Sequence, residues 1–398
     1  MEKSQENKKR RRRSLRGTRL WPLMEAGLTV LLMGGAAALL FAFVLPLLQG
    51  RLSGPADLSC LGIATPTPLP TPTPTPRPSP TLQPGMEKAL YGVDLGQVQQ
   101  EIVIGEYQYA ADFSVTGDTV LFAAGNYTQD GGAAFIRAIA YDVSTKKAAY
   151  YPLELSYTSI RFPRMNDSWI VYLDATSLGG GQLRVYNRRT GENRILKTVH
   201  MGLPALALWE DTVFWVERTG TSRDKLFGCD LNTGESVTLD MLTNQEAAVS
   251  KPYVGGEYLL YVSAPGTITR RNLRTGAVDT LSPGTTVHDP KTDGSIVAFL
   301  TGFHGEDGQL AYIDEGGELH TVANGVEDFD LFDGGLVYGT FDKTYAYFFD
   351  DGATFCLTRR DESALFLAGG GDIALWLDVT WRDKDIIEYM HLTEFEEE

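Results

Sequence analysis

Residues 210–239 read EDTVFWVERTGTSRDKLFGCDLNTGESVTL, and this stretch contains most of the unit that decides the fold. Its Glu-Asp turn leads into TVFWVE, a run that is apolar on both faces, as in a strand packed between two neighbouring sheets. Its Asn-Thr-Gly turn predicts a second hairpin, because Gly234 readily adopts the positive φ that a tight turn needs. Two hairpins in one unit predict four strands.

The same unit recurs along the chain. The second residue of its first turn is found at positions 118, 167, 211, 257, 294, 334 and 372. The mean spacing is about 42 residues, which is typical of four-stranded propeller blades. The second hairpin recurs out of phase with the first, around Gly191, Gly234, Gly276, Gly317 and Gly352, and a copy near Thr145 lacks the glycine. We therefore expect an all-β fold, a seven-bladed β-propeller over residues 88–398, with eight blades as the alternative.

The two ends of this region indicate how the ring closes. A hairpin-like segment around Gly96 precedes the first complete repeat. The last repeat is followed by only one clear strand, DIIEYMHLTEF at residues 385–395. The N-terminal segment is therefore expected to supply the outer strand of the final blade, which removes exposed sheet edges.

The first 50 residues have a different composition. Residues 1–25 carry nine Lys or Arg against three Glu, and residues 26–50 are uncharged and long enough to span a bilayer as a helix. The positive-inside rule places the basic tail in the cytoplasm and the residues after the span outside. This pattern predicts a single-pass protein of the cell membrane with an extracellular C-terminal domain. A cleaved signal peptide is the alternative, and the long apolar segment without a small-residue cleavage site disfavours it.

Residues 51–87 form a predicted linker. Nine of the 19 prolines lie between Pro66 and Pro84, where they alternate mostly with Thr. Because proline fixes φ and lacks the amide hydrogen, the segment favours an extended polyproline II conformation and cannot join a core. We expect an extracellular linker that holds the propeller away from the membrane.

Charge and motif content disfavour several classes of function. The chain has a net charge of −16 although its first 25 residues are basic, so the propeller region is strongly acidic and is not expected to bind nucleic acid. Its three cysteines are too few for a disulfide scaffold and have no metal-binding spacing. The sequence contains no nucleophile elbow, zinc-protease motif, phosphate-binding loop or dinucleotide fingerprint. We therefore predict no catalytic residue, metal site or cofactor, and favour a protein that is not an enzyme.

The first set of candidate binding residues lies on the longer connections. The hairpin turns named above lie on one side of the predicted disc, the turn face. The connections from the second to the third strand, and from blade to blade, lie on the other side, the loop face. Binding groups usually lie on such loops above a rigid scaffold. The loop candidates are Arg223, His304, Asp307, Trp381 and Arg382. The alternative for each is an ordinary solvated loop residue.

The second set lies on the inner strands. Six residues before the second turn residue of each repeat, the chain has Asp112, Arg161, Ala205, Lys251, His288, Asp328 and Phe366. Five of these seven are ionisable, at a radius where side chains can line a central channel. We take Asp112, Arg161, Lys251, His288 and Asp328 as candidate ligand-binding residues, with mutual ion pairing as the alternative.

The Asx-x-x-Thr-Gly hairpins at residues 187–191, 230–234 and 272–276, together with the Asp-Gly turns, resemble the propeller repeats of TolB-like and WD-repeat-like bacterial proteins. The Trp-Asp ending of true WD repeats is absent. The resemblance implies binding of other proteins or of cell-envelope components. Our hypothesis is a membrane-anchored, non-catalytic binding or scaffold module. One alternative is a hydrolase or lyase that uses a divalent cation at the channel mouth. Another is the sensory ectodomain of a signalling pair. The oligomeric state is left open.

Overall fold

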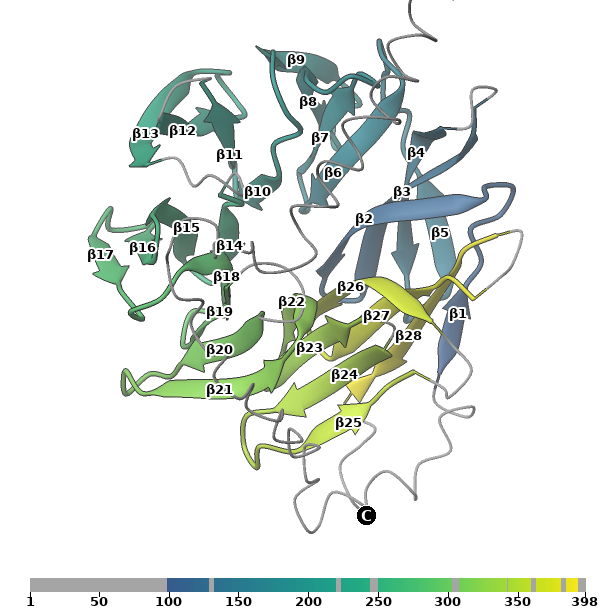
Figure 1. The fold of residues 1–398 in the computed structure, drawn as a ribbon. Helices are drawn as coiled ribbons and strands as arrows, with labels where there is room; N and C mark the ends of the chain where they lie inside the picture. Colours follow the sequence, from purple (N-terminus) through teal and green to yellow (C-terminus); the bar gives the residue numbers. More distant parts are fainter. Residues whose placement is uncertain are drawn as a thin grey trace, which may run out of the picture. The chain divides into compact units, whose positions relative to one another are not determined.

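The computed structural model describes residues 99–128, 132–219, 223–243, 250–302, 308–341, 343–358, 363–380 and 384–392 (Figure 1). These residues form seven four-stranded antiparallel sheets, so the prediction of seven blades rather than eight is confirmed. The predicted basic tail, membrane span and linker, residues 1–87, lie outside the described part of the chain. Within the described part, no helix is long and apolar enough to cross a membrane.

In blades 1 to 6 the four strands follow one another in sequence order, from the centre of the ring outward. Blade 1 contains β2 (Tyr109–Thr116), β3 (Thr119–Tyr127), β4 (Ala133–Asp142) and β5 (Lys147–Tyr150), and blade 2 contains β6 (Ser159–Met165), β7 (Trp169–Ala175), β8 (Gly181–Asn187) and β9 (Asn193–Val199). Blade 3 contains β10 (Leu206–Trp209), β11 (Thr212–Arg218), β12 (Arg223–Asp230) and β13 (Ser236–Thr243), and blade 4 contains β14 (Tyr253–Gly255), β15 (Tyr258–Ala264), β16 (Thr267–Asn272) and β17 (Val278–Leu281). Blade 5 contains β18 (Val287–Thr292), β19 (Val297–Thr301), β20 (Gln309–Ile313) and β21 (Leu319–Asn324), and blade 6 contains β22 (Val326–Phe332), β23 (Gly335–Thr340), β24 (Lys343–Phe348) and β25 (Thr354–Cys356). Blade 7 contains β26 (Ala364–Gly370), β27 (Ile373–Asp378), β28 (Ile386–His391) and, as its outer strand, β1 (Gln100–Ile102).

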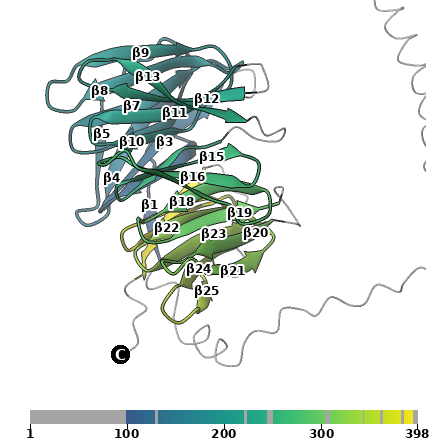
Figure 2. The same cartoon turned by 90° about the vertical axis from the view of Figure 1, so that its left-hand side faces the viewer.

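The blades are arranged around one axis. The inner strand of each blade contacts the inner strand of the next, in the order β2, β6, β10, β14, β18, β22, β26 and back to β2 (Figure 1). The perpendicular view shows the sheets stacked one on another, from the blade of β9 and that of β13 at the top to the blade of β25 at the bottom (Figure 2). This arrangement leaves only the inner strands facing the axis.

The first strand closes the ring as predicted. Gln100 pairs with Tyr389 and Ile102 pairs with Ile387, so β1 completes the sheet of blade 7. The Tyr389 hydroxyl donates to Gln100 Oε1 at 2.7 Å. The fully buried Glu388 accepts Trp376 Nε1–H at 2.9 Å and a hydrogen bond from the Gln99 side chain. Residues from both ends of the described chain therefore share one buried polar cluster.

The hydrophobic core lies between neighbouring blades rather than at the centre of the disc. Trp169 and Val171 of blade 2, for example, pack with Leu206, Val213 and Trp215 of blade 3. Each second strand contacts a blade on either side, which explains why its sequence is apolar on both faces. Because the core lies between the blades, the side chains that stabilise the propeller do not fill the space around its central axis.

Candidate functional site

A cavity of about 460 Å³ lies among the inner strands. All seven blades contribute to its wall. Its charged and aromatic lining residues are Asp112, Phe113, Phe162, Arg164, Lys251, Tyr253, Asp289, Lys291, Asp328, Asp330 and Phe366. The central channel is therefore a concave site walled by the inner strands, and concave sites are the usual setting for ligand binding.

A β-bulge shapes this wall in four blades. In β2, the residues Asp112 and Phe113 together stand opposite the single residue Phe122 of β3. The same two-to-one pairing occurs in β6, β18 and β26, and its first residue has a positive φ each time: 56° at Asp112, 49° at Phe162, 44° at Asp289 and 51° at Phe366. A non-glycine residue in this conformation costs about 1–2 kcal/mol. Such strain is often found at functional sites.

The bulges explain why the predicted inner-strand residues do not all reach the cavity. Asp112, Lys251 and Asp328 line it, as expected. His288 is buried, with 6% of its surface exposed, and Asp289 lines the cavity in its place. Arg161 is also not among the lining residues. In blades 2 and 5 the bulged residue comes five positions before the second turn residue, whereas in blades 1 and 7 it comes six before, so a fixed count of six selects the wrong residue.

Arg161 instead forms an ion pair across two blades. Its Nε atom lies 2.5 Å from Asp112 Oδ2, and its Nη2 atom lies 3.2 Å from Asp112 Oδ1. Asp112 Oδ2 also accepts the backbone N–H of Phe162 at 3.0 Å. The predicted alternative, mutual ion pairing, therefore describes Asp112 and Arg161 well.

Two further ion pairs connect blades 4, 5 and 6. Lys251 Nζ lies 2.6 Å from Asp289 Oδ2, and Lys291 Nζ lies 3.1 Å from Asp330 Oδ1. Burial acts to lower the pKa of Lys251, but the charge and hydrogen bond of Asp289 outweigh it, and that pKa is raised. The Lys251 side chain still has 56% of its surface accessible, because it lies in the open channel with protein on several sides.

Two charged groups of the cavity wall, Asp328 and Arg164, do not form an ion pair of this kind. Asp328 lies near Lys291, Lys251, Asp289 and Asp330, and burial raises the pKa of its carboxyl group despite the two lysines. Burial also lowers the pKa of Arg164, against the opposing influence of Asp112 and Asp330. Within the described residues, neither group has an ion-pair partner within 4.0 Å.

Sequence reasoning missed several lining residues. Arg164, Tyr253, Lys291 and Asp330 each lie two residues beyond a position on the channel wall, on the same face of the inner strand. Period-two alternation from the predicted Lys251 and Asp328 would have found Tyr253 and Asp330. Arg164 and Lys291 lie three residues after the predicted Arg161 and His288, beyond a bulge, so alternation alone would not have found them.

The loop candidates are mostly outside the described residues. His304, Asp307, Trp381 and Arg382 lie there. Arg223 is exposed at the first position of β12, and its carbonyl oxygen accepts a hydrogen bond from the Thr219 hydroxyl. The structure therefore gives this set no common site.

The loop face does carry a set of exposed apolar side chains. Leu178 is 97% exposed and Phe341 is 82% exposed, each in a connection from a second to a third strand. The other members of this set, which we call the loop-face apolar set, are Val103, Tyr127, Tyr157, Met201 and Leu203. In the described hairpin turns of the turn face no large apolar residue is exposed, although Val278 and Leu319, the first residues of β17 and β21 beside two of these turns, are each 50% exposed. Among the described residues, the three most exposed large apolar side chains, Leu178, Phe341 and Val103, all lie on the loop face.

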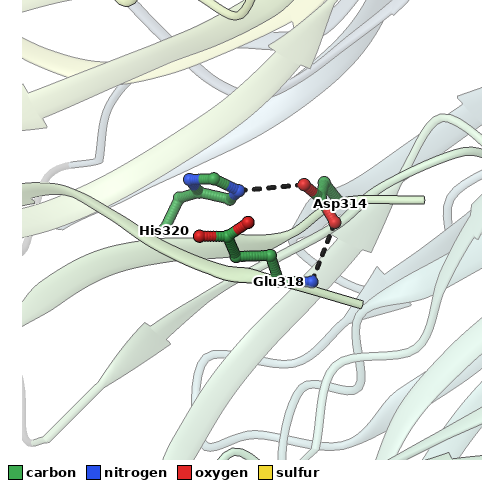
Figure 3. Close-up of side chains that lie close together, drawn as sticks. All are labelled: Asp314, Glu318 and His320. Atoms are coloured by element: carbon green, nitrogen blue, oxygen red, sulfur yellow. Dashed lines mark hydrogen bonds and ion pairs between the residues drawn. The ribbon is translucent and has the colours of Figure 1, made fainter. Parts of the chain in front are cut away.

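A cluster of possible metal ligands lies away from the channel, in the hairpin between β20 and β21. Asp314, Glu318 and His320 bring their ligand atoms within 4.8 Å of one another (Figure 3). Asp314 Oδ1 accepts the Glu318 N–H at 2.8 Å, and Asp314 Oδ2 lies 3.0 Å from His320 Nε2. The hydrogen bond from His320 is the main cause of the lowered pKa of Asp314. Since Asp230 stabilises the corresponding hairpin of blade 3 by accepting the Thr233 N–H, the position of Asp314 is explained by turn formation.

Comparison with known proteins supports the fold. No protein-family model matches the chain, and no curated protein matches it by sequence. A similar solved structure is the β-propeller domain of the Trilobed protease from Pyrococcus furiosus, with a TM-score of 0.56 and 13% identity over 72% of this chain and 94% of that chain. That domain is reported to have an open velcro topology, whereas here β1 is paired with β28.

Two peptidase structures are also similar. An acylaminoacyl peptidase in complex with Z-Gly-Gly-Phe-chloromethyl ketone matches with a TM-score of 0.52 and 10% identity over 69% of this chain and 49% of that chain. An acylaminoacyl peptidase from Pyrococcus horikoshii matches with a TM-score of 0.52 and 9% identity over 71% of this chain and 52% of that chain. This chain thus spans about half the length of these peptidases. At such identities the similarity shows the propeller fold alone, and the TolB-like and WD-repeat-like resemblance stays a prediction.

Proposed function

We propose that this chain is a membrane-anchored, non-catalytic recognition module. Residues 26–50 hold it in the membrane, residues 51–87 separate the propeller from the bilayer, and the loop face binds a protein partner outside the cell. The observation that carries the proposal is that the three most exposed large apolar side chains among the described residues, Leu178, Phe341 and Val103, all lie in connections of the loop face.

Apolar side chains in loops favour a protein surface as the ligand. Contiguous exposed apolar surface is uncommon on proteins that face only water and often marks a protein-binding site. Leu178, Met201 and Leu203 lie on two consecutive connections of blades 2 and 3, between β7 and β8 and between β9 and β10. The two connections are in contact, because the Gly180 N–H donates to the Gly202 carbonyl oxygen at 2.7 Å, so the three side chains lie on neighbouring loops.

Site-specific photo-crosslinking in intact cells tests the proposal. A photoreactive residue in place of Leu178 or Phe341 in the full chain is expected to give one major adduct with a defined partner. The matched positions on the turn face are Thr190 and Thr275, which are exposed in the hairpins of blades 2 and 4. Adducts of equal yield from both faces, or from neither, would contradict the proposal.

A second arm measures the contribution of the apolar side chains. With the photoreactive residue kept at Phe341, Leu178→Ser is expected to lower the yield of the same adduct, because the apolar surface that the leucine buries at the interface contributes to affinity. Thr275→Ser in the same background is expected to leave the yield unchanged. An unchanged yield in Leu178→Ser would remove blade 2 from the binding surface.

A further inference from the structure

The channel cavity has the volume of a small-molecule site. At about 460 Å³ it falls within the range of roughly 300–1,000 Å³ that is typical of ligand pockets. Its wall is made from inner strands rather than from loops, so its shape is set by the ring itself. It is distinct from the apolar loop surface proposed above as a protein-binding site.

Part of the wall is built from small side chains. Ser114 of β2, and Ala205 and Ala207 at β10, leave the channel space open on this side. The inner strands of blades 4, 5 and 6 carry the longer polar groups, from Lys251 to Asp330. The cavity therefore combines free volume beside these small residues with charged groups on several blades, including Arg164 of blade 2.

Three ion pairs account for most of the charges at this wall. They are Asp112 with Arg161, Lys251 with Asp289, and Lys291 with Asp330. Because each pair is neutral as a whole, the remaining groups decide the chemistry of the cavity. In the described part of the chain, the lining groups that have no ion-pair partner within 4.0 Å are Arg164 and Asp328.

Both groups keep hydrogen-bonding capacity for a ligand. The guanidinium of Arg164 has five N–H donors, and its one hydrogen bond goes from Nη1 to the Pro163 carbonyl at 2.9 Å. The carboxylate of Asp328 accepts one backbone bond, from the Phe329 N–H to Oδ1 at 2.9 Å. A charge that is taken partly out of water without a counter-charge in contact is unfavourable, so a ligand that places a counter-charge against it is bound more tightly.

The two groups lie on separated parts of the ring. Arg164 is on β6 and Asp328 is on β22, and in the ring order β26 and β2 lie between them on one side and β10, β14 and β18 on the other. An anion alone would balance the positive charge of Arg164 and leave the negative charge of Asp328 without a partner. An amine alone would balance Asp328 and leave Arg164 without one. A ligand that bears both charges compensates both.

We propose that the central channel binds a small zwitterionic ligand, with its carboxylate on Arg164 and its ammonium group on Asp328. The ligand class is an amino acid or another metabolite that carries one amine and one carboxylate. The small side chains of Ser114, Ala205 and Ala207 provide the space for the part between the two charged ends.

Calorimetric titration of the purified full-length chain in detergent tests the proposal. The probes are linear ω-amino acids from glycine to 6-aminohexanoate, with the matching alkylamine and alkylcarboxylate of each length. Saturable binding of at least one amino acid is expected, about tenfold or more tighter than that of its amine or its carboxylate. The best length reports the separation of the two protein groups. If no amino acid binds at millimolar concentration, or the amine or the carboxylate alone binds as tightly, the proposal is wrong.

Two variants locate the site. Arg164→Gln and Asp328→Asn are each expected to weaken binding of the best amino acid by about tenfold or more, because each removes one charged partner. Arg270→Gln is the matched control, since Arg270 is paired with Asp279 on blade 4, near the outer edge of that sheet. Equal affinity in all three variants would place the ligand elsewhere.

Thermal melting without ligand separates loss of binding from loss of folding. Arg164→Gln and Asp328→Asn are expected to melt no lower than the wild type, because each removes a charge that has no close partner. A clear fall in melting temperature for both variants would show that the two charges are already satisfied in the free protein, and would overturn the proposal.

Discussion

At the scale of single residues, Lys146 departs from the repeat in a way that affects stability. It has a positive φ of 55° in the hairpin between β4 and β5, at the position where the hairpins of blades 2, 3 and 4 have glycine. The preceding Asp142 still accepts the Thr145 N–H at 2.8 Å, as the Asx residues of the other hairpins do. The turn therefore has the same geometry as the hairpins of blades 2, 3 and 4, but here a residue with a side chain adopts the positive φ, which adds strain.

We expect Lys146→Gly to raise the free energy of unfolding by about 1 kcal/mol, because glycine adopts this φ without steric cost. Urea unfolding followed by tryptophan fluorescence measures the change. Lys147→Gly is the control, since Lys147 is the first residue of β5 and glycine in a strand lowers stability by about 0.5–1 kcal/mol. Changes of the same sign in the two variants would contradict the prediction.

Asp328 gives a prediction about pH. Its pKa is raised, first by burial and then by Asp289 and Asp330, although Lys251 and Lys291 oppose the shift. A carboxyl group whose pKa is higher in the folded than in the unfolded chain destabilises the folded chain when ionised. That cost is fully present above the folded pKa, and it disappears as the pH falls below the unfolded value of about 3.9.

Asp328→Asn is therefore expected to melt at a higher temperature than the wild type at pH 8, with a difference that shrinks as the pH approaches 4. Thermal melts across this range measure it. Asp279→Asn is the control, because Asp279 is half-exposed in a surface ion pair with Arg270 and such pairs contribute little. A difference for Asp328→Asn that does not change with pH would show that its carboxyl is not the titrating group.

At the scale of elements, the blades could be predicted from the sequence, whereas the channel wall could be predicted only in part. Turns are specified locally, since Asn187 accepts the N–H groups of Arg189 and Thr190 and Gly191 adopts a positive φ. The bulges are not specified in this way. Phe162 and Phe366 have no preference for the positive φ that they adopt, so the neighbouring strands impose it. For this reason the sequence placed His288 in the channel where the structure places Asp289.

The strand β1 gives the prediction at this scale. Ile102 is 1% exposed and packs in the core between blades 7 and 1, whereas Val103 is 79% exposed. We expect Ile102→Ala to lower the free energy of unfolding by about 2–4 kcal/mol, and Val103→Ala to change it by less than about 0.5 kcal/mol. Urea unfolding measures both. Similar small effects would mean that β1 does not contribute to the stability of the ring.

At the scale of the whole molecule, the prediction concerns orientation. If residues 26–50 span the membrane with the basic tail inside, the propeller is exposed outside the cell. In a chain that carries Cys60→Ser, a membrane-impermeant maleimide is expected to label Thr275→Cys in intact cells, because Thr275 lies in an exposed hairpin. Ser14→Cys is expected to react only after permeabilisation. Labelling of Ser14→Cys in intact cells, with protection of Thr275→Cys, would reverse the predicted topology.

The pairing of β1 with β28 also sets the order of events during synthesis. Gln100 pairs with Tyr389, so the sheet of blade 7 cannot be completed until β28 has left the ribosome. Until then β1 has no hydrogen-bonding partner strand, and the nascent propeller is an open arc with an exposed edge at each end. A nascent chain that stalls before Ile386 would hold six finished blades and still be vulnerable to edge-to-edge association, so synthesis of β28 converts an aggregation-prone intermediate into a closed ring.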